Sequence, residues 1–305
     1  MSFFNILLAF KQKHPQLQDK CLYSRLSNPQ QAARIQQPDA ISPPMTRCTP
    51  ASRDDLDFHC TQCGRCCEEL WLPLSISEAR IWIRDGNPVA VFCQAIPWPD
   101  EPAADNLPAR YKRERSSAAM AGTLPVRVLV SLAAPQGNHC PNLQADKRCA
   151  IYARRPSVCR AYPAEPNPLL QLFPQQRRCP PECWQAGGEP LIREGDYVDA
   201  GLRQLLADVG GRAIAEAAPL QHLCAALDIH VAALANEGFA VHLPHQDALG
   251  TALEQCTSPQ ESRPQDWTFI AHMPASIEAI RACGASCIPA DHADGLALQY
   301  IRLGL

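Results

Sequence analysis

The chain has 305 residues, 46% of them hydrophobic, so it can bury one large core or two modest ones and is not a fully disordered chain. Its 28 Lys and Arg residues face 31 Asp and Glu residues, a formal charge of −3, which excludes a general electrostatic attraction to nucleic acid or anionic membranes. The 29 prolines and 16 cysteines exceed average usage and indicate irregular structure organised through sulfur chemistry.

The first 50 residues are rich in Gln, Pro and Ser and lack a sustained periodicity, so we predict a flexible N-terminal extension over 1–50, with Met45 as an alternative start. The apolar run at the start has no preceding basic residue and no small-residue cleavage site, unlike a secretory signal. No apolar run approaches the roughly 20 residues of a transmembrane helix. We therefore expect a cytoplasmic protein, in which clustered thiols are metal ligands or catalytic groups more often than disulfides.

The segment FHCTQCGRCCEEL opens a cysteine-dense block that we place at 51–190. Cys60, Cys63 and Cys66 are each three residues apart, a spacing that lets tight turns direct several sulfurs at one point, and Gly64 permits the turn backbone. Cys67 directly follows Cys66, and adjacent side chains diverge in most backbone conformations, so we do not expect both to ligate one ion. One of them is expected to serve a second metal or to support the first.

The next elements are predicted from the spacing of their apolar residues and from the residues that typically begin or end helices and strands. Residues 75–86 form a short helix, because Ser75 and Glu78 have capping-box spacing and Gly86 can end it. The Pro-rich residues 94–125, which include the basic run RYKRER, are expected to be a solvated loop rather than a nucleic-acid site. Residues 126–132, VRVLVSL, are a candidate strand.

Three sulfurs do not complete a tetrahedral site or a cluster, and further cysteines follow in CPNLQADKRCAIYARRPSVCRAYP and RRCPPECW. The set is large enough for two four-coordinate sites, or for one cluster plus a spare group. The metal can be zinc or iron, the latter including a 4Fe–4S cluster, because both accept four thiolates. The predicted metal ligands are Cys60, Cys63, Cys66, Cys67, Cys140, Cys149, Cys159, Cys179 and Cys183.

Four thiolates around a divalent ion retain excess negative charge, so nearby guanidinium groups are expected to donate to the sulfurs. Six arginines are close to the cysteines in sequence: Arg65, Arg148, Arg154, Arg155, Arg160 and Arg178. We take Arg155 and Arg160 as the candidate cofactor-binding residues. Cys93, Cys224 and Cys256 are isolated from other cysteines, and we expect them to be core residues.

Beyond residue 190 the pattern is helical over 196–211, 211–218 and 219–238, which predicts a helical region at 191–245. The tail, 246–305, contains WTFIAH, SIEAIRACG and LALQYIRL, predicted as strand, helix and strand. The expected fold class is α+β but mostly α: an irregular, metal-organised, cysteine-rich core with few short strands, followed by a small helical region.

The two cysteine motifs, FHCTQCGRCC and CAIYARRPSVCRAYP, resemble the CxxCxxCC cysteine-cluster family of zinc- or iron-chelating domains, which includes YkgJ-type proteins. The resemblance covers roughly residues 54–190, excepting the insertion at 94–125. Cys60, Cys63, Cys66 and Cys67 match its leading motif; the second element is matched by Cys149, Arg155, Pro156, Cys159, Arg160 and Pro163. Flagellin lysine methylases share the motif, which implies that an iron–sulfur cluster and methyl transfer occur in relatives.

Three functions remain open from the sequence. The first is a metal-binding protein that holds zinc or an iron–sulfur cluster. The second is an enzyme that uses this centre for redox or methyl-transfer chemistry, and the third is a thiol–disulfide module. No phosphate loop, nucleotide fingerprint or Ser/His/Asp set identifies catalytic residues. The expected partner is a metal ion, with neither membrane nor nucleic acid.

Overall fold

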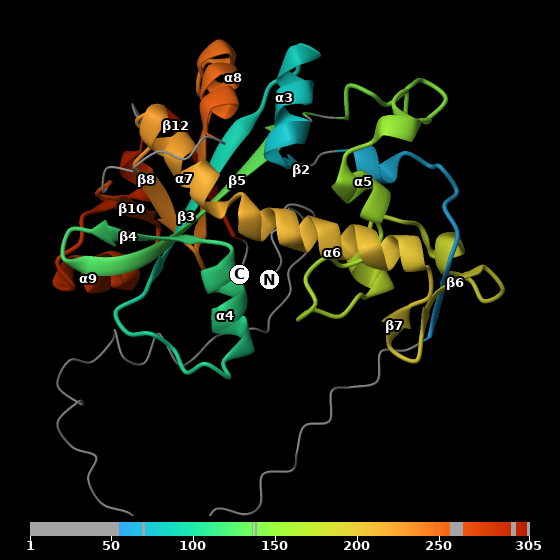
Figure 1. The fold of residues 1–305 in the computed structure, drawn as a ribbon, viewed down its shortest axis with the longest axis horizontal. Helices are drawn as coiled ribbons and strands as arrows, with labels where there is room; N and C mark the ends of the chain where they lie inside the picture. The colour runs from blue at the N-terminus through green and yellow to red at the C-terminus, as the bar shows by residue number, and fades with distance from the viewer. Residues whose placement is uncertain are drawn as a thin grey trace, which may run out of the picture.

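The computed structural model describes residues 55–68, 71–135, 137, 139–256, 265–293 and 297–303. The predicted extension 1–50 and the alternative start at Met45 lie outside these residues. The described chain forms a large mixed sheet with helices packed on it, and a cysteine-containing region beside that sheet (Figure 1). None of the described helices combines the length and the apolar composition needed to cross a bilayer.

The large sheet has nine strands, and its main path runs β11-β10-β8-β3-β5-β2; β4 adds to β5, and β9 pairs with β3 and β12. The bounds are β2 Trp71–Leu74, β3 Ala90–Pro97, β4 Ser117–Ala121, β5 Leu124–Pro135, β8 Val231–Leu234, β9 Gly238–His242, β10 Thr268–Ala271, β11 Cys287–Pro289 and β12 Leu298–Arg302.

The centre of this sheet is an antiparallel pair of long strands. β3 pairs with β5 from Ala90 opposite Ala133 to Pro97 opposite Val126. The predicted strand 126–132 lies within β5 and is confirmed. The predicted loop 94–125 is wrong, because it contains the end of β3, helix α4 (Leu107–Glu114) and β4. The basic run RYKRER lies mostly in α4, whose start is capped by the Asn106 side chain.

The rest of the large sheet comes from the C-terminal part of the chain. β8, β10 and β11 are parallel, and helix α9 (Pro274–Ala282) connects β10 to β11. The predicted strand, helix and strand of the tail are confirmed as β10, α9 and β12. The helix predicted over 219–238 is only half correct: α7 (Ala217–Ala226) ends early, and the chain continues into β8 and β9.

The predicted mostly α fold class is therefore wrong, since the described residues contain twelve strands in mixed sheets and seven α-helices. The strands were not recognised because several of them are buried on both faces. β3 and β9 are buried on both faces, so their sequences AVFCQAIP and GFAVH are nearly continuous apolar runs without the alternation of a half-exposed strand.

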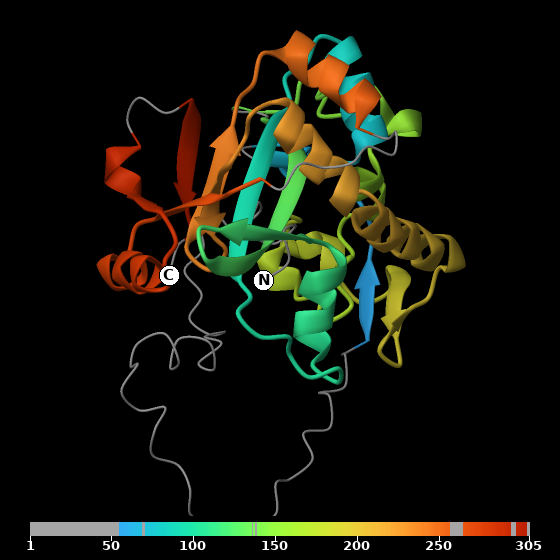
Figure 2. The same ribbon diagram turned by 60° about the vertical axis from the view of Figure 1, so that its left-hand side comes forward.

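Helices α3 (Ile76–Arg84), α7 and α8 (Gln246–Gln255) pack together and against the large sheet. Figure 2 shows them grouped on one side of the long strands. The predicted helix at 75–86 is confirmed as α3, with both hydrogen bonds of the capping box between Ser75 and Glu78. Its buried face includes Ala79 and Trp82.

The cysteine region, which we define as residues 55–68 and 139–199, has little regular structure. It contains a small sheet of β1 (Leu56–Phe58), β6 (Glu189–Arg193) and β7 (Asp196–Tyr197), and helix α5 (Ser157–Ala161). Its 3-10 turns are η1 Arg65–Cys67, η2 Tyr152–Arg154, η3 Pro174–Gln176 and η4 Pro181–Trp184; η5, Ala290–His292, lies in the tail. Helix α6 (Ala200–Ala215) contacts β7 and α5 of the cysteine region as well as α7, so it links the cysteine region to the helices on the sheet (Figure 1).

Candidate metal centre

The leading cysteine motif turns at Gly64. This residue has φ 74°, in the left-handed region, and its carbonyl accepts a 2.8 Å hydrogen bond from the Cys67 amide. A Cβ there would lie 3.1 Å from Leu143 Cδ1, so both the backbone and the space favour glycine. The turn brings the Sγ atoms of Cys66 and Cys67 to 4.0 Å. The expectation that these two side chains diverge is therefore wrong.

Backbone contacts bring the second cysteine segment to this turn. The Cys140 amide donates to the Cys67 carbonyl at 2.7 Å, and Leu143 and Cys149 form an isolated antiparallel bridge. The third segment is helix α5, which contains Cys159 and packs against β2. Three parts of the chain thus meet between the large sheet and the cysteine region.

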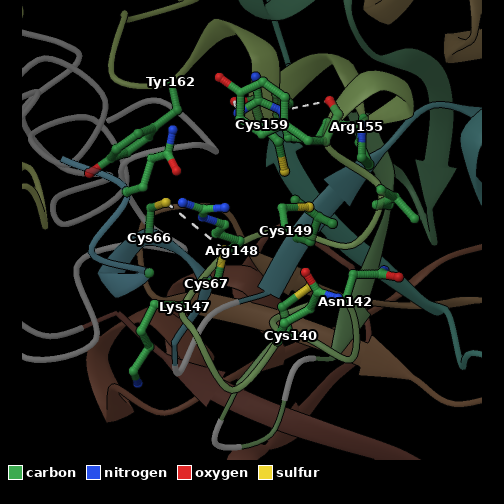
Figure 3. Close-up of a pocket in the computed structure, with 18 of the residues that line it drawn as sticks. Cys66, Cys67, Cys140, Asn142, Lys147, Arg148, Cys149, Arg155, Cys159 and Tyr162 are labelled. Carbon is green, nitrogen blue, oxygen red and sulfur yellow. Dashed lines mark hydrogen bonds between the residues drawn. The ribbon is translucent and has the colours of Figure 1, made fainter. Parts of the chain in front are cut away.

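A cavity of 480 Å³ lies where they meet. Six cysteines line it: Cys60, Cys66, Cys67, Cys140, Cys149 and Cys159. Figure 3 shows the sulfurs of the labelled cysteines around the same space, with Arg148, Arg155 and Tyr162. The lining also includes the apolar side chains of Trp71, Leu72 and Trp82. The cavity is therefore bounded by soft sulfur donors and by apolar groups.

Thiolate sulfur is a preferred ligand of zinc and of iron–sulfur clusters, so the donor set suits either group chemically. Among the described residues, however, no three His, Cys, Asp or Glu side chains converge at the spacing that one metal ion requires. The sulfurs lie along the wall of a cavity rather than around a point.

The pKa values of the thiols differ because their electrostatic surroundings differ. The hydrogen bond from Cys67, together with the charges of Arg155 and Arg178, lowers the pKa of Cys66 to about 7. The same hydrogen bond and burial raise the pKa of Cys67 far above its usual range. Burial also raises the pKa of Cys159, and the neighbouring thiols reinforce this shift.

Burial likewise raises the pKa of Cys140, with a further contribution from the charge on Cys149. Close thiolates repel one another, so most of these groups retain their protons until a cation compensates their charge. A bound cation would displace those protons, and its affinity would rise with pH.

Three of the predicted ligands do not line the cavity. Cys183 is buried; its carbonyl accepts from the His59 amide at 2.9 Å, and its Sγ lies 3.4 Å from Thr61 Oγ1. Burial raises the pKa of Cys179 to about 12, and the charges of Cys183, Cys66 and Cys60 add to that increase. Cys63 is half-buried and is also absent from the lining. Cys179 thus lies close enough to Cys183, Cys60 and Cys66 to be affected by their charges, although neither Cys179 nor Cys183 lines the cavity.

The candidate cofactor-binding arginines have different positions. Arg155 lines the cavity, stacks on the Tyr152 ring at 3.8 Å, and donates from Nε to the Tyr152 carbonyl at 3.1 Å. Arg160 is exposed and is not a lining residue. Arg178 donates through Nη1 to the Glu68 carbonyl at 2.7 Å, while Arg154 pairs with Asp85 at 3.3 Å outside the cavity.

Tyr162 is a site residue that sequence reasoning did not identify. It lines the cavity, and its hydroxyl accepts from the Arg178 amide at 2.8 Å. Its pKa is raised, first by burial and then by the neighbouring Cys179. The sequence feature that could have identified Tyr162 is its position between Cys159 and Pro163 in the second cysteine motif. The isolated Cys93, Cys224 and Cys256 are buried in the main core, as expected.

Comparison with known proteins supports metal binding by this part of the chain. Residues 59–183 match the model of the CxxCxxCC family, whose description is "Putative zinc- or iron-chelating domain". The match covers less than half of the 305 residues and confirms the resemblance for this segment. No curated protein and no solved structure matches the chain.

Proposed function

We propose that residues 59–183, as a CxxCxxCC domain, hold an iron–sulfur cluster in the cavity bounded by β2, α3 and α5. The observation that carries this proposal is the convergence of six thiols from three chain segments on one cavity of 480 Å³. A bound cluster would supply one-electron redox chemistry.

The shape of the donor set favours a cluster over a single zinc ion. Zinc binds sulfur at about 2.3 Å, so two sulfurs on one ion are at most about 4.6 Å apart. The described thiols do not gather three at a time at such spacing. In a cluster the cysteines bind different iron atoms around a larger inorganic core, and their sulfurs are further apart.

We assign Cys66, Cys140, Cys149 and Cys159 as the four ligands, since they face the cavity from all three segments. Cys67 would remain protonated and donate to the Cys66 thiolate, in line with the directions of their two pKa shifts. Arg155 and Arg178 would balance the charge on Cys66. Cys60, Cys63, Cys179 and Cys183 would then support the site from its edge.

The test is anaerobic purification followed by iron, acid-labile sulfide and zinc analysis. Iron with equimolar sulfide and a brown colour would support the proposal, whereas stoichiometric zinc without sulfide would overturn the cluster assignment. Cys149→Ser should lose the metal. The matched control is Cys283→Ser, because Cys283 is also half-buried but lies outside the cavity, and it should retain the metal.

A thiol–disulfide function is a second candidate, favoured by the low pKa of Cys66 and its 4.0 Å approach to Cys67. Alkylation separates the two functions. If the thiols are ligands, the metal-loaded protein protects Cys66 from iodoacetamide at neutral pH, and chelation exposes it. A thiol–disulfide module would react at Cys66 equally in both states.

A further inference from the structure

The carboxylate of Glu78 connects two helices that are distant in sequence. Glu78 lies in α3, on the sheet side of the molecule, and its Oε2 accepts from the Ser75 amide at 2.9 Å. Its other oxygen, Oε1, accepts from the Ser157 amide at 2.7 Å and from the Ser157 hydroxyl at 2.8 Å. One side chain therefore caps α3 and also holds the first residue of α5.

Helix α5 depends on this contact because it has no cap of its own. It spans five residues, and Pro156 before it provides no side-chain acceptor for its first amides. Ser157 is 8% exposed, so its amide would otherwise be buried without a partner. Cys159 follows two residues later, and its own amide donates to the Pro156 carbonyl at 3.0 Å.

The end of helix α6 also forms hydrogen bonds with the starts of α3 and α5. Arg212 donates to the Ser157 hydroxyl at 2.6 Å, so this hydroxyl both donates to Glu78 and accepts from Arg212. Glu216, at the end of α6, accepts from the Ile76 amide at 3.1 Å. The starts of α3 and α5 are thus fixed against one turn of α6.

We propose that Glu78 is a positioning residue for the metal centre. By holding the start of α5 against α3, it sets the place of the Cys159 thiol in the cavity. This inference rests on the proposed metal-binding function, but it concerns a residue outside the cysteine motifs. Glu78 touches no thiol, and its effect on the metal passes through Ser157 and the backbone of α5.

The test compares variants of the full chain by metal affinity, measured by chelator competition, and by the visible absorption of the metal–thiolate centre. Glu78→Ala should weaken metal binding by about tenfold and shift the absorption bands, because α5 loses its anchor. Glu78→Gln should restore most of the affinity, since an amide oxygen can still accept from Ser157.

Ser75→Ala is the matched control, because it removes a side-chain hydrogen bond of the α3 cap and leaves both contacts to Ser157. It should lower the midpoint of thermal unfolding but leave metal affinity and absorption unchanged. Wild-type affinity in Glu78→Ala, with a loss of thermal stability like that of Ser75→Ala, would overturn the proposal and leave Glu78 a simple helix cap.

A variant on the α5 side keeps the inference testable if Glu78→Ala does not fold. Ser157→Ala removes the hydroxyl contact with Glu78 and Arg212 but retains the amide contact. Partial loss of metal affinity supports the proposal, and wild-type affinity contradicts it. If the wild-type protein binds no metal, the proposed function itself is wrong. The same metal-binding assay shows this before any variant is compared.

Discussion

The large sheet and the cysteine region are stabilised by different interactions. The largest fully buried side chains among the described residues include Trp267, Phe92, Phe239 and Phe269, all in or beside the large sheet, whereas Ile192 is the cysteine region's sole member of that group. The cysteine region instead contains one short α-helix, 3-10 turns and hydrogen bonds from charged groups. Apolar burial therefore stabilises the sheet, while the cysteine region has little such burial.

This difference explains why a metal belongs in one region and not in the other. A segment that buries few apolar side chains gains little from the hydrophobic effect and requires another source of stability. Metal–thiolate bonds supply that stability in small domains. The following predictions test whether the two regions respond to different changes, beginning with the largest expected effect.

Phe269→Ala should lower the free energy of unfolding by about 3–5 kcal/mol, because the ring is fully buried in β10 and its removal leaves a cavity. Denaturant unfolding measures the change. Phe173→Ala in the cysteine region is the matched control, since that ring is 42% exposed and its removal should change stability by less than about 0.5 kcal/mol. Equal effects would refute the contrast between the regions.

Glu165→Ala should be nearly as severe, although it removes no apolar core. Glu165 and Arg177 form an ion pair at 3.1 Å, and each side chain is 1% exposed. Loss of the carboxylate removes the ion pair that this buried guanidinium makes with Glu165, which destabilises by about 3 kcal/mol. Thermal unfolding of the metal-loaded protein would measure this loss, and an unchanged midpoint would show that the pair does not support the cysteine region.

Acid should weaken the sheet through His242. This side chain is buried in β9 and its Nε2 lies 2.8 Å from the Val231 carbonyl; burial lowers its pKa below the usual 6.5. The unfolded chain therefore binds the proton more readily, so this contribution is complete above pH 6.5 and is lost as the pH falls through the folded pKa.

The measurement is the free energy of unfolding as a function of pH for the wild type and for His242→Gln, which retains a donor for Val231. The variant should be less sensitive to pH between the folded pKa and 6.5. Parallel curves for the two proteins would show that His242 does not titrate in this way. This effect is expected to be the smallest of the three.

Local signals predicted those elements whose determinants are close in sequence. The Ser75–Glu78 capping box predicted α3, and a short run of β-branched residues that ends at a proline predicted β5. The spacing of the first cysteines and Gly64 predicted the tight turn. Strands β3 and β8 were missed because their residues are apolar or small on both faces, and only their partners in the sheet distinguish them from helix or loop.

The candidate site was predictable in its residue types but not in its arrangement. Spacing cannot indicate that Cys140, Cys149 and Cys159 face the same cavity while Cys179 and Cys183 lie beside it, since this depends on tertiary packing. Cys159 and Arg160 are adjacent in sequence, but only Cys159 lines the cavity, while Arg160 is exposed. The sequence alone does not distinguish these two orientations. The second oxygen of Glu78 acts on a residue 79 positions away, which a helix-capping motif does not reveal.

Hydrogen exchange of the metal-loaded and the metal-stripped protein, followed peptide by peptide, tests the central claim most directly. The account predicts that removal of the metal abolishes amide protection in residues 139–199 and leaves that of β3 and β5 intact. Equal protection of the cysteine region in both states would contradict the claim that a metal bound by its thiols stabilises this region.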